Sequence, residues 1–198
     1  MKTKSWALLI TLACVSFFSN LKAQTSVPVG KVVNVPVTAN GSSTFHAILN
    51  LPDDYNTTSG SYPLLIFCHG VGEAGTDLST EYNSTNAGGV SYFLEHNLFP
   101  TSFTGPTDGK TYKFIVLCPQ APTFSTSGQQ LDYMIKYMIA NYRVDTTRLY
   151  LTALSAGGAG IFDYTTHNGF TPSRNPTAIV PMSMDIGVPQ QSMENQVK

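Results

Sequence analysis

The sequence predicts an α/β fold with a doubly wound, mostly parallel sheet, helices on both faces and an N-terminal antiparallel hairpin. Three observations support this prediction. From residue 62 onward, apolar runs of strand length alternate with segments of helical period. Two β-like segments flank Asn40 and Gly41, a dipeptide that readily folds two strands back on each other. The run at residues 62–68 is apolar throughout, which is typical of a central parallel strand covered on both faces.

The expected elements follow in the order β-β-β-α-β-α-β-α-β. The segment at residues 129–142 is the clearest helix, because its apolar residues recur at helical spacing on one face. Gly169 is expected to cap the last helix. Strands that alternate with helices imply parallel pairing, and sites in such sheets lie outside the carboxyl ends of the strands. We expect strands at residues 31–38, 44–51, 62–68, 113–118, 148–153 and 177–182, and helices at residues 90–97, 129–142 and 157–168.

The N-terminus has the features of a signal peptide for export. Two lysines precede an apolar run at residues 6–18, and Ala23 offers a small residue for cleavage. The run is shorter than the roughly 20 apolar residues that span a bilayer, which argues against a membrane anchor. A lipoprotein cut before Cys14 is a weaker alternative. We therefore expect a signal peptide at residues 1–23, one domain at residues 24–198, and a secreted or periplasmic protein.

The composition limits the partners of the protein. Charged residues make up only 12% of the chain and the formal net charge is -1, so no broad electrostatic field recruits nucleic acid or, after signal cleavage, a membrane surface. Cys68 and Cys118 each end an apolar run, where buried free thiols are common. A disulfide would need their strands to be neighbours, with a geometry that is awkward between parallel strands. Two cysteines without nearby histidines make no zinc site, and we expect no metal.

The first candidate motif lies between the strand at residues 148–153 and the following helix. It reads Ala-Leu-Ser-Ala-Gly, with Ser155 at its centre. A sharp strand-to-helix turn needs small residues two before and two after the serine, so that the backbone packs closely while the hydroxyl is lifted clear. Ala153 and Gly157 meet this size requirement. The helix N-terminus beyond the serine also favours negative charge developing on a bound carbonyl group.

The second candidate motif is the glycine-rich loop that follows the strand at residues 62–68. It begins His69, Gly70, Val71, Gly72, and its glycines free backbone N–H groups to face a ligand. A phosphate-binding loop is the alternative, but the sequence lacks both G-x-x-x-x-G-K-[ST] and a helix-opening G-x-G-x-x-G. Two motifs in this order, each at the end of an expected strand, are more specific than either alone.

Three segments, at residues 63–73, 116–122 and 142–158, resemble the phospholipase/carboxylesterase branch of the α/β-hydrolases. Secreted feruloyl-esterase-like and polyhydroxybutyrate-depolymerase-like enzymes are similar. The resemblance spans about residues 45–185. It implies a serine esterase without a metal or an organic cofactor, acting on a small-molecule or polysaccharide-linked ester.

The resemblance also assigns roles by position. Ser155 corresponds to the nucleophile, and the backbone N–H groups of Val71 and Ala156 correspond to the oxyanion hole. His69 and Glu73 belong to the loop and shape it rather than act as a base. Gly70, Gly72 and Gly157 support the same arrangement.

A serine nucleophile needs a histidine and a carboxylate, and this family places both after the serine. Only 43 residues follow Ser155, and the family's acid and histidine come after strands beyond residues 177–182. His167 follows the serine, but twelve helical residues carry it roughly 18 Å away. Asp185 follows the last strand, without a histidine after it. We therefore expect a C-terminally truncated hydrolase domain with little or no turnover.

Two other functions fit the same residues. One is a catalytically dead protein that keeps the hydrolase sheet as a binding scaffold. The other is a secreted serine peptidase, because that branch shares the serine motif and the His69-Gly70 strand end. Oligomeric state and substrate identity do not follow from the sequence.

Overall fold

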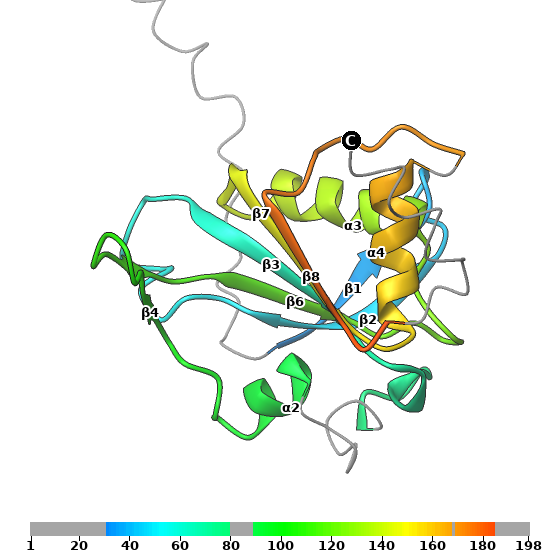
Figure 1. Ribbon diagram of the computed structural model, residues 1–198, viewed down its shortest axis with the longest axis horizontal. Helices are drawn as coiled ribbons and strands as arrows, with labels where there is room; N and C mark the ends of the chain where they lie inside the picture. The colour runs from blue at the N-terminus through cyan, green and yellow to red at the C-terminus, as the bar shows by residue number, and fades with distance from the viewer. Residues whose placement is uncertain (1–30, 80–88, 168, 185–198) are drawn as a thin grey trace, which may run out of the picture.

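A computed structural model describes residues 31–79, 89–167 and 169–184, and the expected signal peptide lies outside these residues. Its centre is a six-stranded sheet in the order β1-β2-β6-β3-β7-β8 (Figure 1). The strands are β1 (Lys31–Pro36), β2 (Thr44–Asn50), β3 (Tyr62–Cys68), β6 (Ile115–Pro119), β7 (Val144–Leu154) and β8 (Ala178–Met182).

The sheet is mostly parallel, as the sequence predicts. The pairs β3–β6, β3–β7 and β7–β8 are parallel, whereas β1–β2 and β2–β6 are antiparallel. The turn between β1 and β2 places Gly41 at a φ of 69°, a left-handed conformation that glycine adopts without steric cost. The N-terminal antiparallel hairpin is therefore confirmed, and the parallel strands place their carboxyl ends at one edge of the sheet.

Helices cover both faces of the sheet, again as expected. On one face, α3 (Gly128–Asn141) and α4 (Gly157–Thr166) pack on the larger of two apolar cores. Leu131 and Met134 of α3 and Ile161 and Tyr164 of α4 are fully or almost fully buried there. On the other face, the short helix α2 (Val90–Glu95) contacts a smaller core. This arrangement is a doubly wound α/β sheet.

Some element ends differ from the expected ones. β7 begins four residues earlier than expected, at Val144, because that residue pairs with Tyr62 across the sheet. Helix α2 ends at Glu95, two residues early, and α4 ends at Thr166. His167, with a φ of 60°, caps α4 in place of the expected Gly169. Three short elements are not predicted by the sequence, namely the 3₁₀ turn η1 (Val71–Glu73) and the two strands of a hairpin, β4 (Phe103–Thr104) and β5 (Thr111–Tyr112).

Cys68 and Cys118 are buried and are not joined in a disulfide. Their strands β3 and β6 are neighbours, and Ile66 is paired with Leu117. Because side chains alternate between the faces of a strand, Cys68 and Cys118 then point to opposite faces. Cys68 accordingly lies in the larger core and Cys118 in the smaller one, so the sheet itself separates the two thiols.

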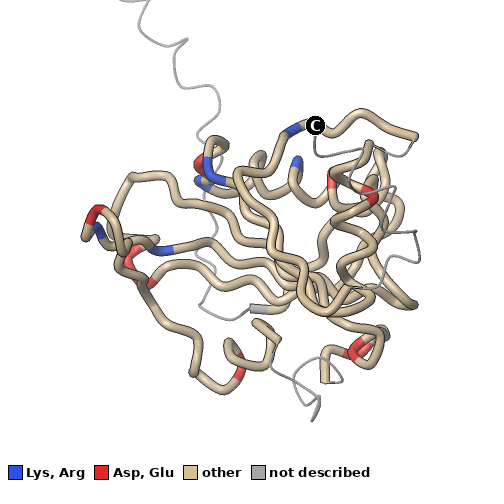
Figure 2. The backbone as a smooth tube through the Cα atoms, viewed as in Figure 1, with Lys and Arg blue, Asp and Glu red and all other residues tan. Residues whose placement is uncertain are grey.

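Charged residues are sparse and scattered over the backbone (Figure 2). Lys113 bridges Asp53 and Asp54, at 2.6 and 3.0 Å, and Arg148 pairs with Asp145 at 2.7 Å. Within the described ranges, no helix is long and apolar enough to cross a membrane. The same residues contain no group of three or more histidine, cysteine or acidic side chains placed to hold a metal ion.

Candidate active site

Ser155 lies on the sharp turn between β7 and α4, at the carboxyl end of the sheet. Its φ is 49°, in the left-handed region that residues other than glycine seldom adopt. Its backbone N–H donates to the Met182 carbonyl oxygen at 2.8 Å, which fixes the turn to the end of β8. The serine is nevertheless exposed. A strained turn that presents a hydroxyl to solvent is the geometry that a nucleophile requires.

The small residues around the serine are required by close packing. A side-chain carbon placed on Gly157 would stand 2.3 Å from the Cys68 carbonyl oxygen and 2.6 Å from that of His69. Ala153, on the other side of the serine, is fully buried. The start of α4 thus lies directly against the end of β3, which brings the two sequence motifs together.

The glycine-rich loop lies beside the serine. A side-chain carbon placed on Gly70 would stand 3.7 Å from the Cβ of Ser155 and 3.7 Å from the Leu154 carbonyl oxygen. The loop continues into η1, where the Glu73 N–H donates to the Gly70 carbonyl oxygen at 3.1 Å. The predicted loop and the predicted nucleophile are therefore neighbours in space.

Two backbone N–H groups at this junction have no hydrogen-bond partner among the described residues. They belong to Val71, which begins η1, and to Ala156, which follows the serine at the N-terminus of α4. The 10-residue helix α4 adds a partial positive charge at this end. Both N–H groups and the helix N-terminus interact favourably with negative charge.

His69 is buried beneath the loop, with an exposed fraction of 2%. Its Nε2 accepts a hydrogen bond from the Ala121 N–H at 2.9 Å, so the ring proton is on Nδ1, which donates to the Gly70 carbonyl oxygen at 2.7 Å. Burial lowers the pKa of the His69 ring. Both nitrogens are thus occupied by backbone groups, and neither is available to take a proton from Ser155.

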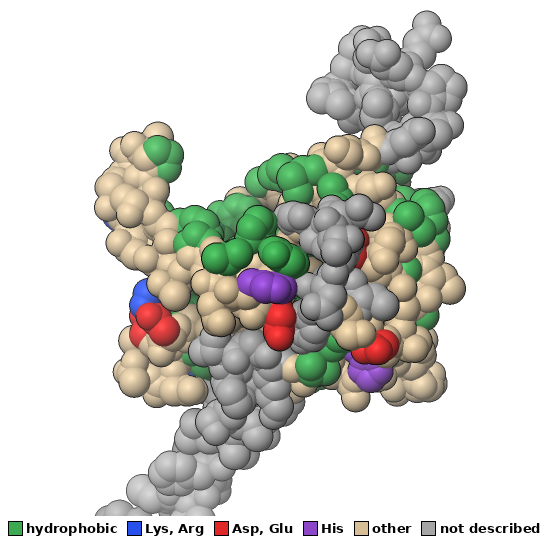
Figure 3. All heavy atoms as spheres, turned by 90° about the horizontal axis from the view of Figure 1, so that it is seen from below, with side chains coloured by type: hydrophobic (Ala, Val, Ile, Leu, Met, Phe, Trp, Pro, Cys, Tyr) green, Lys and Arg blue, Asp and Glu red, His purple; other side chains and the backbone are tan. Residues whose placement is uncertain are grey.

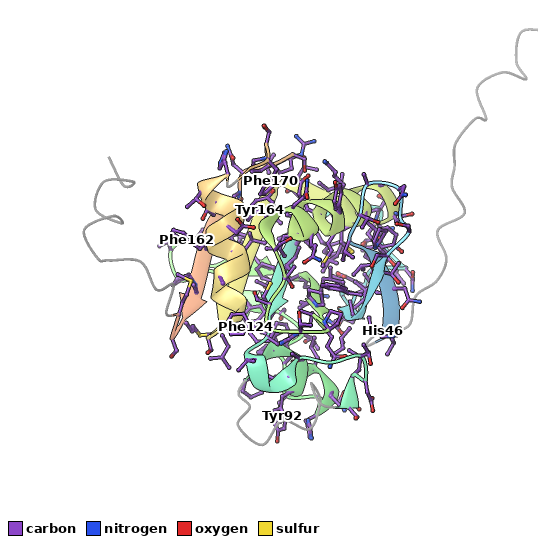
Figure 4. All side chains as sticks on the ribbon, turned by 90° about the vertical axis from the view of Figure 1, so that its right-hand side faces the viewer. His46, Tyr92, Phe124, Phe162, Tyr164 and Phe170 are labelled. Atoms are coloured by element: carbon purple, nitrogen blue, oxygen red, sulfur yellow. The ribbon has the colours of Figure 1, made fainter. Side chains whose placement is uncertain are left out.

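Among the described residues, none of the other three histidines is hydrogen-bonded to the serine. His46 is exposed on β2, and Figure 4 shows it across the molecule from α4. His96 stacks on Tyr92, with ring centroids 4.0 Å apart. His167 is exposed at the C-terminal end of α4, whereas Ser155 precedes its N-terminal end. No histidine of the described residues is therefore placed as a base for Ser155.

Asp185, the carboxylate that follows the last expected strand, lies outside the described residues. The structure therefore brings together the predicted nucleophile and the glycine-rich loop. Among the described residues, it adds no acid–base pair to them.

The sequence indicated residues 116–122 only through the family resemblance, and not that this segment holds the glycine-rich loop in place. Gln120 and Ala121 follow β6, and the Gln120 side-chain amide donates to the carbonyl oxygens of Glu73, at 2.9 Å, and Asp77, at 3.0 Å. The Gly75 N–H donates to the Ala121 carbonyl oxygen at 2.9 Å. One signal could have indicated this contact, because the segment directly follows a parallel strand and so lies at the same sheet edge as the loop.

Apolar side chains are exposed around this end of the molecule. Val71, in the loop itself, is 55% exposed, and Phe93 and Leu98 of the α2 region are 37% and 60% exposed. Seen from below, hydrophobic side chains gather on the face that carries α2 (Figures 1 and 3). A surface of this kind favours contact with apolar groups over contact with highly charged ones.

No protein-family model matches this sequence, and no curated protein matches it. Solved structures do match. A ferulic acid esterase is 18% identical with a TM-score of 0.51, and the match covers 82% of this chain and 62% of that chain. A lipase/esterase from Lactobacillus plantarum is 17% identical with a TM-score of 0.50, and the match covers 85% and 69% of the two chains. A thermostable esterase is 22% identical with a TM-score of 0.49, over 66% and 36% of the two chains.

The protein has the α/β-hydrolase fold, in an incomplete form. The sheet order, the N-terminal antiparallel hairpin and the similarity to the ferulic acid esterase agree on this fold. The chain spans less than two thirds of the length of the thermostable esterase and of the ferulic acid esterase. At these levels of identity the similarity defines the fold, and the chemistry has to be argued from the site itself.

Proposed function

We propose that this protein is a serine esterase of the α/β-hydrolase fold, with Ser155 as its nucleophile. The observation that carries this proposal is the conformation of Ser155, an exposed serine at a φ of 49° on a strand-to-helix turn. The glycine-rich loop beside it supports the same assignment. The solved structures with this fold include esterases, which makes ester hydrolysis the first reaction to test.

The proposed reaction proceeds through an acyl-enzyme. The Ser155 oxygen attacks the ester carbonyl carbon and loses its proton to a base, and the carbonyl oxygen becomes an oxyanion. The N–H groups of Val71 and Ala156 are the proposed donors to this oxyanion. The bond to the alcohol oxygen then breaks, and the alcohol leaves with a proton. Water hydrolyses the resulting serine ester and restores the hydroxyl.

The base is the missing part of this mechanism in the described residues. Removing the histidine of a serine triad leaves a residual rate about 10³–10⁴ above that in water, which comes from the oxyanion hole and from binding. Because both His69 nitrogens are hydrogen-bonded to backbone groups and no other histidine of the described residues is hydrogen-bonded to Ser155, we expect this 198-residue chain to retain only such a residual rate.

The test compares the protein with Ser155→Ala on p-nitrophenyl acetate and p-nitrophenyl butyrate. We expect slow release of p-nitrophenolate that Ser155→Ala lacks, together with a mass increase of one acyl group located on Ser155. Equal rates for the two proteins, with no acylated serine, would falsify the esterase assignment for this chain. A parallel assay on p-nitroanilide substrates separates an esterase from a peptidase.

The proposed substrates are small-molecule or polysaccharide-linked esters, and the proposed location is outside the cytoplasm. The lysines and apolar run of the first 23 residues support export. Expression of the full chain in a bacterium, followed by fractionation and N-terminal sequencing, tests this location. We expect a processed form that begins at Gln24 in the periplasm or the medium, and an unprocessed cytoplasmic chain would contradict export.

A further inference from the structure

The glycine-rich loop closes on itself through a buried carboxylate. The Gly70 N–H donates to Glu73 Oε2 at 2.7 Å, and the Glu73 N–H donates back to the Gly70 carbonyl oxygen at 3.1 Å. Glu73 is only 3% exposed. Burial raises the pKa of this carboxyl group, although the hydrogen bond from Gly70 partly offsets the increase. A carboxylate is costly to bury, so its placement here calls for a role that a neutral surface residue would not serve.

The carboxylate occupies the backbone N–H of the loop residue that lies beside the serine. Gly70 is the loop residue that lies against Ser155, but Glu73 takes its N–H. The next N–H along the chain, that of Val71, is left without a partner among the described residues. The Ala74 N–H donates to the Val71 carbonyl oxygen at 3.2 Å, which fixes the other side of that residue. With the Gly70 N–H bound to Glu73, the Val71 N–H is the next backbone donor of the loop that is open to a ligand.

Gln120 ties this closed loop to the sheet. Its side-chain amide donates to the carbonyl oxygens of Glu73 and Asp77, and its own backbone N–H donates to the His46 carbonyl oxygen on β2 at 2.8 Å. Gln120 is 1% exposed. The position of the loop relative to Ser155 is therefore set by the edge of the sheet, through a side chain that follows β6.

We propose that Glu73 is a positioning residue, which Gln120 holds in place and which aims the Val71 N–H at the oxyanion that forms beside Ser155. This inference rests on the proposed function, because it requires a reaction at Ser155. Glu73 acts through the backbone of its own loop and touches no reacting atom. The chemical class that the site would recognise is an ester or phosphonate whose oxygen gains negative charge in the transition state.

The test uses an alkyl p-nitrophenyl phosphonate on the full chain at pH 9, where hydroxide can take the serine proton. The Ser155 oxygen forms a bond to phosphorus, the bond from phosphorus to the nitrophenyl oxygen breaks, and p-nitrophenolate is released. The phosphoryl oxygen needs the same N–H donors as an ester oxyanion. The rate is read from absorbance, and the modified residue is identified by mass spectrometry.

We expect Glu73→Ala to lower the labelling rate about 10²-fold, as the loss of one oxyanion donor does in other enzymes. Glu73→Gln keeps an oxygen that can accept from the Gly70 N–H, so it should recover the rate to within about fivefold of the unaltered protein, since a neutral acceptor is weaker by roughly 1 kcal/mol. Gln120→Met, which keeps the length of the side chain but loses its donors, should lower the rate in the same direction.

Asp132 provides the matched control. It is a second buried carboxylate, 3% exposed, and it accepts from the Ser173 N–H and hydroxyl on the α3 side of the molecule. Asp132→Ala should lower the melting temperature as Glu73→Ala does, without lowering the labelling rate of the folded protein. A merely structural role for Glu73 would make the two variants alike in both measurements.

Ser155→Ala separates the two proposals. The positioning role is wrong if the phosphonate does not label Ser155→Ala but labels Glu73→Ala at the rate of the unaltered protein. It is also wrong if Glu73→Gln does not recover the labelling rate. In both cases the assignment of Ser155 as the nucleophile stands. If the unaltered protein and Ser155→Ala behave alike, the proposed function itself is wrong. A lower rate in Glu73→Ala, recovered in Glu73→Gln and absent in Asp132→Ala, supports the positioning role.

Discussion

At the scale of single residues, the site depends on a histidine that is held in one protonation state. His69 donates from Nδ1 to Gly70 and accepts at Nε2 from the Ala121 N–H. A second ring proton would have to point at that N–H, in a buried position where the charged ring loses its hydration. Folding and ring protonation therefore oppose each other.

The stability of the protein should accordingly depend on pH through His69. Burial lowers the His69 pKa in the folded protein below its usual 6.5, so the stabilisation from the neutral ring is fully present above pH 6.5. It is lost as the pH falls from 6.5 through the lower pKa of the folded state. For one proton, the free energy of unfolding cannot change by more than about 1.4 kcal/mol per pH unit. Urea unfolding between pH 7.5 and 5.5 should show a smaller loss of stability in His69→Gln than in the unaltered protein.

The sign of the pH dependence and a control variant separate the effect of His69 from that of other titrating groups. Glu73 has a raised pKa, so its contribution has the opposite sign, and stability from that group grows as the pH falls through its folded-state pKa. His46→Gln, at an exposed position on β2, should keep the slope of the unaltered protein. Identical slopes for His69→Gln and the unaltered protein would contradict the neutral, buried state of the ring.

Site residues could be predicted where the pattern that indicates them lies within a few positions of the sequence. Ser155 and Gly157 stand two positions apart, and their turn needs only a small residue near a strand end. By contrast, Ala121 lies 52 residues from its partner His69, and Gln120 lies 47 residues from Glu73. The end of a parallel strand predicts that residues 120 and 121 lie at the same sheet edge as the glycine-rich loop. Nothing in a short window of sequence indicates which distant backbone group a buried glutamine or histidine will meet, so the individual hydrogen bonds that hold the loop could not be predicted.

At the scale of elements, helix α4 touches its neighbours through backbone atoms. A side-chain carbon on Gly157 would stand 2.3 Å from the Cys68 carbonyl oxygen, and one on Gly160 would stand 2.1 Å from that of Thr126. Across the two helices, a side-chain carbon on Gly128 of α3 would stand 2.5 Å from the Tyr164 nitrogen. Figure 4 shows Tyr164 beside Phe170 near the C-terminal end of α4, with ring centroids 5.9 Å apart.

The close contact at Gly157 gives a testable consequence for stability. Gly157→Ala places a methyl group against two carbonyl oxygens that belong to the backbone and cannot rotate away. Overpacking of this kind costs about 1–3 kcal/mol, and α4 would move away from β3. Gly60→Ala is the matched control, because nothing lies within 4 Å of a side-chain carbon there. Urea unfolding should show the loss in Gly157→Ala alone, and equal midpoints would contradict the close packing of α4 on β3.

The ends of helices and strands were also predicted well where nearby residues determine them, and less well where a contact with a distant residue does. β3 was predicted with its observed bounds because its apolar run is continuous. β7 begins earlier than expected because Val144 pairs with Tyr62, a contact across the sheet. The hairpin β4–β5 has only two residues in each strand, too few for an alternating pattern to be recognised.

At the scale of the whole molecule, the two faces of the sheet are covered unequally. One face carries α3 and α4, and the other carries α2 over β3 and β6. A hollow of about 620 Å³ lies between the sheet and the β4–β5 hairpin. Leu65, Tyr150 and Val180 line it, and Val180 is 58% exposed. Parallel sheets are usually covered on both faces, so this apolar surface is unusual for its fold.

This hollow should bind small apolar molecules in the native state. An anilinonaphthalene dye should fluoresce on binding, while near-ultraviolet circular dichroism shows that the tertiary structure is intact and that no molten state binds the dye. Val180→Lys puts a charge at the wall of the hollow and should weaken dye binding at least about tenfold, since a desolvated charge is costly. Val32→Lys is the control, because Val32 is 47% exposed on the opposite edge strand, β1, away from the hollow. Equal dye affinity in the two variants would place the apolar binding surface elsewhere on the molecule.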